Sequence, residues 1–311
     1  MSRRGWILLV AVGVIWGIPY LLIKIAVGEV TPVMVVFVRT ALGTLLLLPF
    51  ALRAGGLRVL RGHWRPLLAF AALEIVGPWI LLSNAERTLA SSTTGLLVAT
   101  VPIAAVVLGR LVGDRRPVAG VRWIGLLVGL GGVALLLGPG AASSGSPWAV
   151  AQVLLAAVGY ASAPIIADQF LRDVPAIPLT ATCLGVTALV YLPVVLLTGP
   201  HAWPSTDGVL ALVALVALGA VCTALAFVLF FRLIVEVGAA RSTLVAYLNP
   251  VVAVTLGAIV LDEAVTVAVL VATALILLGS AAASRRSADP DEPVSVQATR
   301  VGDGATGTAP V

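Results

Sequence analysis

The sequence predicts an all-α membrane protein of ten transmembrane helices, arranged as two inverted five-helix repeats. Of its 311 residues, 60% are hydrophobic and only 11% are charged, whereas soluble domains have about 25% charged residues. Apolar stretches follow one another up to residue 283, each close to the roughly 20 residues that span a bilayer core as a helix. Features of the first five stretches recur in the second five, which predicts the repeat.

Ten spans can be placed from end to end along the chain. They cover residues 5–27, 32–52, 66–84, 91–112, 119–137, 148–168, 178–197, 208–230, 240–260 and 265–283. The boundary between the third and fourth spans is the weakest, because only Asn84, Glu86 and Arg87 interrupt the apolar run. The first span resembles a signal peptide but lacks a small-residue cleavage site, so we expect it to be retained.

The basic residues are distributed asymmetrically among the loops. In the ten-span arrangement, 16 of the 19 Lys and Arg residues fall on one side of the membrane, Arg87 falls on the other, and Lys24 and Arg39 lie within spans. Positive charge is retained in the cytoplasm during insertion, which predicts a multi-pass protein of the cell (plasma) membrane with both termini cytoplasmic. The net charge of +5 is therefore a topology signal, and we expect no nucleic-acid partner.

The strongest internal similarity joins the fourth and ninth spans. The stretches LASSTTGLLVATVPIAAVVLGRLVGDR from Leu89 and VGAARSTLVAYLNPVVAVTLGAIVLDE from Val237 both begin with small residues and end in acidic ones. Each carries a proline, Pro102 or Pro250, 13 residues after its first residue. Weaker similarities in the same order join Trp16-Gly17 to Tyr160-Ala161 and Thr31-Pro32 to Val174-Pro175.

A repeat unit of five spans must invert, because an odd number of crossings places the second copy on the opposite side. We expect one membrane domain, residues 1–283, with repeats at about 5–137 and 148–283. The polar composition of residues 284–311 predicts a disordered cytoplasmic tail. Inverted repeats are a common plan of secondary transporters, which hold substrate near the midplane between the two halves.

This arrangement resembles the drug/metabolite transporter superfamily, specifically its EamA-type exporters. The resemblance covers about residues 5–283, and the residues that carry it are Trp16-Gly17, Arg39 with Ala41, Pro102…Gly113-Asp114-Arg115 and Pro250…Asp262-Glu263. The family usually has Gly-Glu-Arg at the first exit, so Asp114 is a conservative departure. The resemblance implies export of a small metabolite or drug by alternating access, and it does not name the substrate.

Among the ionisable residues inside predicted spans three stand out, because charge deep in a span is costly and marks candidate functional sites. Glu74 lies near the middle of the third span, Arg39 in the second, and Lys24 one turn from the outer end of the first. For Lys24 we favour snorkelling to the membrane interface. Arg39 and Glu74 are expected at similar depth, as either a structural ion pair or a functional site. Because intramembrane acids often serve as proton relays, Glu74 is also the candidate for proton coupling.

Aromatic and amide side chains complete the predicted substrate-binding site. With Arg39 and Glu74, its members are Trp16, Tyr20, Trp79, Tyr160, Tyr247 and Asn249. Most lie within a turn of a proline, which bends a helix, and aromatic faces bind apolar or cationic ligands. Taken singly, each is better explained by helix packing. The group Tyr247-x-Asn249-Pro250 is the strongest, because it joins two polar side chains to a kink at midspan.

Small residues predict close helix contacts in the fifth and tenth spans. Gly125, Gly129, Gly131 and Gly132 have counterparts at comparable places in Ala272, Gly279 and Ser280. They predict either a scaffold contact or the interface of a homodimer. The acids Asp114, Asp262 and Glu263 lie at span exits, where capping and interfacial pairing explain them. The two cysteines, Cys183 and Cys222, are interpreted as packing residues.

The sequence thus predicts a transporter of small molecules in the lipid bilayer, without metal or cofactor. The alternative from another class is a membrane-embedded enzyme acting on a lipid-soluble substrate. That chemistry needs a nucleophile–base set or clustered metal ligands, but the two histidines, His63 and His201, fall in loops on opposite sides. An ion channel is a third class, although no segment resembles a selectivity filter or a charged ring.

Overall fold

The computed structural model describes residues 1–55, 58, 60–111, 120–138, 146–198 and 208–283, and their regular secondary structure is helical throughout. Eight helical stretches in these residues are long and apolar enough to cross a membrane, and two shorter apolar helices, Val245–Val260 and Val267–Ala283, follow them. The prediction of an all-helical membrane protein is confirmed. The predicted tail and the exit residues around Asp114 lie outside the described residues.

Each long stretch corresponds to one predicted span, and several are built from two or three helical segments. In chain order the segments are α1 (Arg3–Gly17), α2 (Pro19–Ala26), α3 (Pro32–Arg53), α4 (Trp64–Ala71), η2 (Ala72–Val76), α5 (Gly77–Ala85), α6 (Ser91–Val98), α7 (Val101–Leu111), α8 (Gly120–Leu137), α9 (Pro147–Phe170), α10 (Ala176–Thr198), α11 (Val209–Gly219), η4 (Ala220–Leu225), α12 (Ala226–Val237), α13 (Ala239–Ser242), α14 (Val245–Val260) and α15 (Val267–Ala283). The eighth stretch ends at Val237, later than the predicted residue 230.

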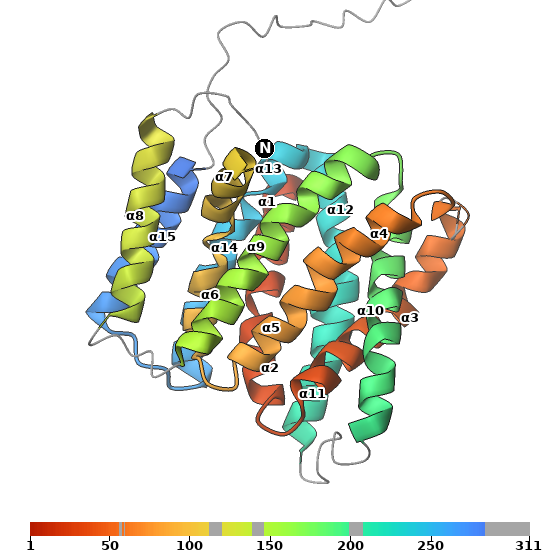
Figure 1. The fold of residues 1–311 in the computed structure, drawn as a ribbon, viewed down its shortest axis with the longest axis horizontal. Helices are drawn as coiled ribbons and strands as arrows, with labels where there is room; N and C mark the ends of the chain where they lie inside the picture. Colours follow the sequence, from red (N-terminus) through yellow and green to blue (C-terminus); the bar gives the residue numbers. More distant parts are fainter. Residues whose placement is uncertain (56–57, 59, 112–119, 139–145, 199–207, 284–311) are drawn as a thin grey trace, which may run out of the picture.

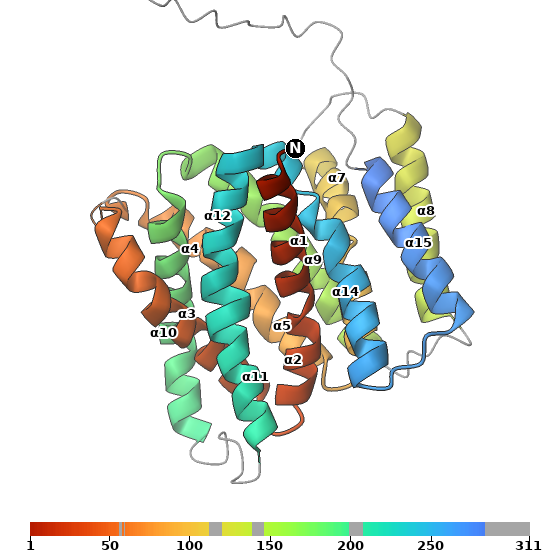
Figure 2. The ribbon, with the colours of Figure 1, turned by 180° about the vertical axis from the view of Figure 1, so that it is seen from behind.

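The helices form two layers with a pair of helices at either end. Helix α9 packs against α4, α5, α6 and α7 on the near side of Figure 1, and α1 packs against α12 and α14 on the side that faces the viewer in Figure 2. Helices α3 and α10 pair at one end, and α8 and α15 at the other. The layers meet where α6 contacts α14 and α2.

Local sequence signals explain where several helices begin. Ser2 caps α1 by accepting a hydrogen bond from the Gly5 N–H at 2.9 Å. Thr31 caps α3 in the same way, and Pro32 follows it at the first helical position, where a proline loses no hydrogen bond. Pro19 separates α1 from α2, because a proline inside a helix lacks the N–H and crowds the preceding turn.

Two π-helical segments, η2 and η4, interrupt the third and eighth long stretches. In η2 the cause is Pro78, whose ring displaces the backbone carbonyl four residues earlier, that of Glu74. The Tyr191 hydroxyl donates a hydrogen bond to the Val76 carbonyl at 2.8 Å and so satisfies part of the irregular backbone. In η4 the Thr223 hydroxyl donates to the Leu218 carbonyl at 2.8 Å. Both segments therefore place a polar side chain, Glu74 or Thr223, on a locally widened helix.

The predicted small-residue contact lies between α8 and α15. A Cβ atom on Gly125 would lie 2.7 Å from the Gly279 carbonyl oxygen, and one on Gly279 would meet the backbone of Gly129. Only helices without side chains at these positions can approach so closely. The contact within the chain is confirmed, whereas a homodimer stays a prediction.

Candidate functional site

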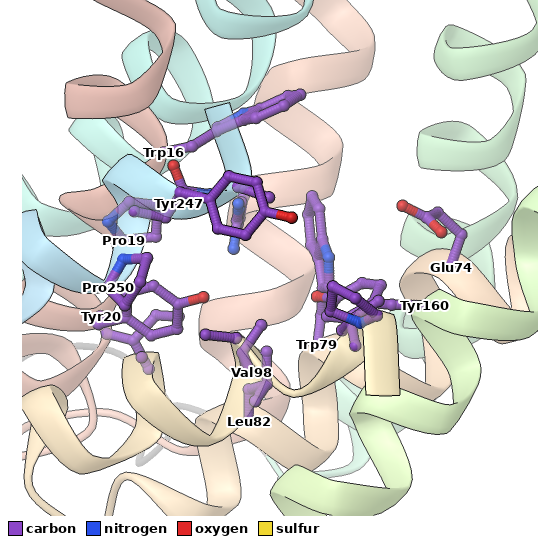
Figure 3. Close-up of a pocket in the computed structure, with 18 of the residues that line it drawn as sticks. Trp16, Pro19, Tyr20, Glu74, Trp79, Leu82, Val98, Tyr160, Tyr247 and Pro250 are labelled. Carbon is purple, nitrogen blue, oxygen red and sulfur yellow. The ribbon is translucent and has the colours of Figure 1, made fainter. Parts of the chain in front are cut away.

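A cavity of about 330 Å³ lies between the two layers, and all eight residues predicted to bind substrate line it. Figure 3 shows the aromatic side chains converging on the space from several helices. They come from α1 and α2 (Trp16, Tyr20), α3 (Arg39), η2 (Glu74), α5 (Trp79), α9 (Tyr160) and α14 (Tyr247, Asn249). Their gathering is a finding of the structure, and substrate binding by them remains a prediction.

Arg39 is the buried cation of the cavity, with 8% of its surface exposed. Its guanidinium carbon lies 3.6 Å from the centre of the Trp79 ring, which is cation–π geometry. Its Nε donates a hydrogen bond to the Thr223 hydroxyl at 3.0 Å. The arginine of α3 is thus held by an aromatic face from α5 and a hydroxyl from η4.

The structural ion pair considered for Arg39 and Glu74 is absent, and that hypothesis was wrong. Within the described part of the chain, the salt bridge present joins Arg172 to Asp168 on the surface. In Figure 3 Glu74 lies beyond Trp79 and Tyr160, on the far side from Tyr20 and Tyr247. Arg39 and Glu74 were expected to pair because they lie at similar depth along the membrane normal. Two residues at the same depth can still lie on different sides of a cavity.

Trp16 begins a cluster of aromatic rings at the side of the cavity formed by α12. Its ring centre lies 5.7 Å from that of Phe227, edge to face, and 4.6 Å from that of Phe230. Phe227 also lines the cavity. Edge-to-face and tilted pairs at these distances are favourable, so this wall is an apolar surface of packed rings.

Gly95 lets Tyr20 and α14 approach the cavity closely. A Cβ on Gly95 would lie 2.6 Å from the Ala253 side chain and 3.4 Å from the Tyr20 ring. The small residue therefore sets the distance between α6, α2 and α14. Gly95 thus shapes the cavity, although it is not among the eight residues predicted to bind substrate.

Asn249 uses its amide to join α14 to α1. With the amide oriented to suit its surroundings, the nitrogen donates to the Val245 carbonyl at 3.0 Å and to the Gly13 carbonyl at 3.1 Å. Gly13 and Gly17 are the places where α1 lies directly against α14. The amide at the kink before Pro250 is therefore occupied by backbone partners, and Tyr247 beside it presents the aromatic side chain to the cavity.

Lys24 reaches the turn between the third and fourth long stretches. Its ammonium donates hydrogen bonds to the backbone carbonyls of Glu86, at 2.7 Å, and Leu89, at 2.8 Å. These carbonyls belong to the turn that follows α5, where the last carbonyls of a helix lack partners within it. The ammonium is thus bound at the boundary of two long stretches, and its snorkelling to the membrane interface stays a prediction.

Two acids beside this turn form a cluster that sequence reasoning did not assign to the site. Glu263 accepts hydrogen bonds from the backbone N–H groups of Ser91, at 2.7 Å, and Ser92, at 3.0 Å, at the start of α6. This confirms its expected capping role, since a carboxylate is favoured at a helix N-terminus. Glu86 is fully buried, and neither oxygen of its carboxyl has a hydrogen-bond partner among the described residues. Burial raises the pKa of Glu86 well above its usual range, Lys24 opposes this, and Glu263 adds to it.

The residues that the sequence analysis missed could in part have been found from spacing. Phe227 follows Trp79 by 148 residues, the interval that also separates Pro102 from Pro250. By the same interval Cys222 follows Glu74, so a thiol stands where the first half has a carboxyl. Glu86 lacked such a signal, because a glutamate beside an arginine at a span boundary resembles an ordinary loop residue.

The described residues contain no group of three or more His, Cys, Asp or Glu side chains able to hold a metal ion. Cys183 and Cys222 are buried free thiols. Both lie within the packed helices, as expected of small packing residues.

Comparison with known proteins agrees with this architecture. Residues 3–138 and again residues 147–285 match the EamA-like transporter family. The uncharacterized inner membrane transporter YedA of Escherichia coli (strain K12) is 30% identical over 259 residues, which are 80% of each chain. The uncharacterized transporter YdeK of Bacillus subtilis (strain 168) is 26% identical over 275 residues, 85% of this chain and 91% of YdeK.

A solved crystal structure shares the fold. It superposes with a TM-score of 0.65 at 23% sequence identity, covering 91% of this chain and 98% of its own. The names of the family and of the relatives indicate a membrane transporter rather than an enzyme. The family match extends over nearly all of the helical part of the chain, and the resemblance found in the sequence is thereby confirmed: the chain belongs to the EamA-like transporter family.

Proposed function

We propose that the protein is a secondary transporter that exports small organic molecules by alternating access, with Glu74 coupling export to proton movement. The observation that carries this proposal is the cavity, whose wall is shared by the two segments that match the family. Residues 3–138 contribute Arg39 and Trp79, and residues 147–285 contribute Tyr160 and Tyr247. A site shared by two halves is the arrangement that rocking of one half against the other can expose to either side.

The two halves are proposed to be inverted repeats of five spans each. The π-helical segments η2 and η4 begin at Ala72 and Ala220, 148 residues apart, the same interval as between Pro102 and Pro250. The shorter helices α14 and α15 then correspond to the stretches Ser91–Leu111 and Gly120–Leu137 of the first half. On this basis they are the ninth and tenth spans, although their 16 and 17 residues extend somewhat less than a bilayer core of about 30 Å.

Helix interruptions beside the cavity support movement of its walls. The first long stretch breaks at Ile18 between Trp16 and Tyr20, the fourth breaks after Val98, and η2 carries Glu74. Interrupted helices around a central site recur in secondary transporters. At such an interruption the two helical segments can tilt relative to each other while each keeps its own backbone hydrogen bonds.

The direction of transport and the orientation follow from the charge distribution and the family resemblance. Positive residues concentrated on one side favour cytoplasmic termini. With the termini inside, the EamA-type resemblance implies movement of substrate from the cytoplasm outward. The membrane itself is then the protein's main partner, together with the small-molecule substrate.

Glu74 is the proposed proton carrier because it borders the cavity within a π-helical segment and forms no ion pair with the described basic residues. An acid neutralised by a permanent cation could not exchange its proton readily. An acid beside an accessible cavity can exchange it with water when the cavity opens.

Transport by purified protein in lipid vesicles under an imposed pH gradient tests the proposal. Wild-type protein should move substrate in the direction opposite to proton flow, and Glu74→Gln should bind substrate but lose the dependence on the gradient. Asp168→Asn, which changes an exposed surface acid, is the matched control. Gradient-driven transport by Glu74→Gln at the wild-type rate would contradict the assignment, provided that both variants elute as monodisperse protein.

A further inference from the structure

Arg39 carries a positive charge into the cavity, and Glu86 acts on this charge only from a distance, without forming an ion pair. No carboxylate of the described chain forms an ion pair with it, and the structure assigns hydrogen bonding to its Nε alone, toward Thr223. A guanidinium has five N–H donors. The remaining donors are therefore available to a molecule in the cavity that Arg39 lines.

Burial of a charge at this position needs compensation. A charged side chain removed from water is strongly penalised unless it is paired, and within membranes such residues face a cavity and mark the substrate path. Trp79 compensates part of the charge through its ring face. A planar anion can supply the rest, because a carboxylate accepts two parallel hydrogen bonds from a guanidinium.

The other cavity walls indicate what the rest of such a ligand looks like. Rings of Trp16, Tyr20, Tyr160, Tyr247 and Phe227 surround the space. A volume of about 330 Å³ is at the small end of the range for sites that enclose drug-sized ligands. One ring system with a short chain fits such a space, and aromatic walls favour an apolar body.

The position of Glu74 decides between an anion and an amino acid. In an α-amino acid the ammonium lies beside the carboxylate, so a carboxylate held at Arg39 would bring the ammonium to the same place. In Figure 3 Glu74 lies beyond Trp79 and Tyr160, away from Tyr20 and Tyr247, and it forms no ion pair with Arg39. The ammonium would then share the site with an arginine of like charge.

We propose that the cavity binds an amphipathic organic monoanion, a carboxylate attached to one aromatic or apolar ring system, with the carboxylate on Arg39 and the ring among the aromatic walls. This specifies the substrate class of the proposed transporter and rests on that function for its biological meaning. Binding itself can be measured without transport. Failure of the two proposals can therefore be told apart.

Four ligands with the same phenylpropyl skeleton test the charge preference: phenylpropionate, phenylpropanol, phenylpropylamine and phenylalanine. Binding of radiolabelled phenylpropionate to purified protein in detergent, with the others as competitors, gives their relative affinities. We expect phenylpropionate to bind about tenfold more tightly than the alcohol, as for a hydrogen bond to a charged group. The amine and the amino acid should bind more weakly than the anion.

Arg39 variants assign the preference to its guanidinium. Arg39→Gln should remove the advantage of phenylpropionate over phenylpropanol while the affinity for the alcohol stays within about threefold, which also reports a folded cavity. Arg39→Lys should keep part of the preference, because an ammonium lacks the bidentate geometry. Arg172→Gln, on the surface, is the control and should leave all four affinities unchanged.

The proposal is overturned if phenylalanine or phenylpropylamine binds as tightly as phenylpropionate, or if phenylpropionate does not bind at millimolar concentration. An equal loss of affinity for all four ligands in Arg39→Gln would assign Arg39 a structural role and also overturn it. Saturable binding of phenylpropionate without flux in vesicles would instead contradict the transport function and leave the anion site standing.

Discussion

The guanidinium carbon of Arg39 lies 3.6 Å from the centre of the Trp79 ring, and this contact joins α3 to α5 at the wall of the cavity. Trp79 is itself buried, with 7% of its surface exposed. A cation held on a ring face away from bulk water is stabilised more than one at a surface. The pair thus contributes to the shape of the cavity as well as to its charge.

Replacement of Trp79 should destabilise the protein more when the new side chain has no aromatic ring than when it keeps one. We expect Trp79→Leu to lower the melting temperature in detergent more than Trp79→Phe, because the cation–π contact contributes about 0.5–2 kcal/mol and leucine has no ring face. In an Arg39→Gln background the difference between the two variants should shrink, as a double-mutant cycle requires for coupled groups. An undiminished difference would show that Trp79 acts by volume alone. Trp64→Leu is the control, since Trp64 is 59% exposed and Arg65 lies 5.1 Å from its ring centre.

Removal of the Lys24 ammonium should weaken the turn between α5 and α6. Lys24→Met keeps most of the side-chain volume but loses the hydrogen bonds to the Glu86 and Leu89 carbonyls. Hydrogen bonds to charged groups contribute about 1.5–3 kcal/mol each, so the melting temperature should fall clearly, and hydrogen exchange should accelerate in residues 86–90. Lys24→Arg should recover part of the loss. A melting temperature unchanged in Lys24→Met would refute this role.

The buried carboxyl of Glu86 should make stability depend on pH. Since its pKa is raised in the folded state, the folded protein binds this proton more strongly than the unfolded chain does. Stability is then greatest below the unfolded pKa of about 4.3 and is lost as pH rises toward the folded pKa. We expect the melting temperature of the wild type to fall as pH rises above the unfolded pKa, and that of Glu86→Gln to fall less. Equal slopes for the two proteins would show that Glu86 does not carry the dependence.

Two glycines of the α8–α15 region offer a matched test of close packing. A Cβ on Gly279 would meet the backbone of Gly129, whereas one on Gly131 has no atom within 4 Å. Gly279→Ala should therefore lower stability by about 1–3 kcal/mol through overpacking. Gly131→Ala should be neutral or slightly stabilising, because alanine favours a helix by up to about 1 kcal/mol. Thermal melting in one detergent compares them, and similar effects in both variants would contradict the packing argument.

Local chemistry allowed much of the fold to be predicted. Apolar stretches separated by polar turns placed helices such as Pro32–Arg53 and Gly120–Leu137 within a few residues of their observed ends. The glycines of the fifth and tenth spans identified a contact that the structure places between α8 and α15. The π-helical segments were not predicted, since Pro78 signals a kink without stating how the backbone accommodates it.

The candidate site was predictable as a set of residues but not as a geometry. Costly charge and clustered aromatics within spans identified eight side chains that line one cavity. Their pairing was not predictable, since Arg39 meets Trp79 and Thr223 rather than Glu74. Lys24 shows the same limit, because its partners are backbone carbonyls that lie 62 and 65 residues away in sequence.

By itself, the sequence determined that the chain is helical and lies in a membrane, and it identified the residues too polar or too aromatic to be explained by lipid contact. These properties follow from hydropathy and helix length, which depend only on residues close together in the sequence. The tertiary structure decided which charges meet, which remain without a partner, and how large a space they enclose. Those properties depend on the rotation and spacing of packed helices, which contacts such as Gly13 on Leu248 and Gly95 on Ala253 set across long sequence distances.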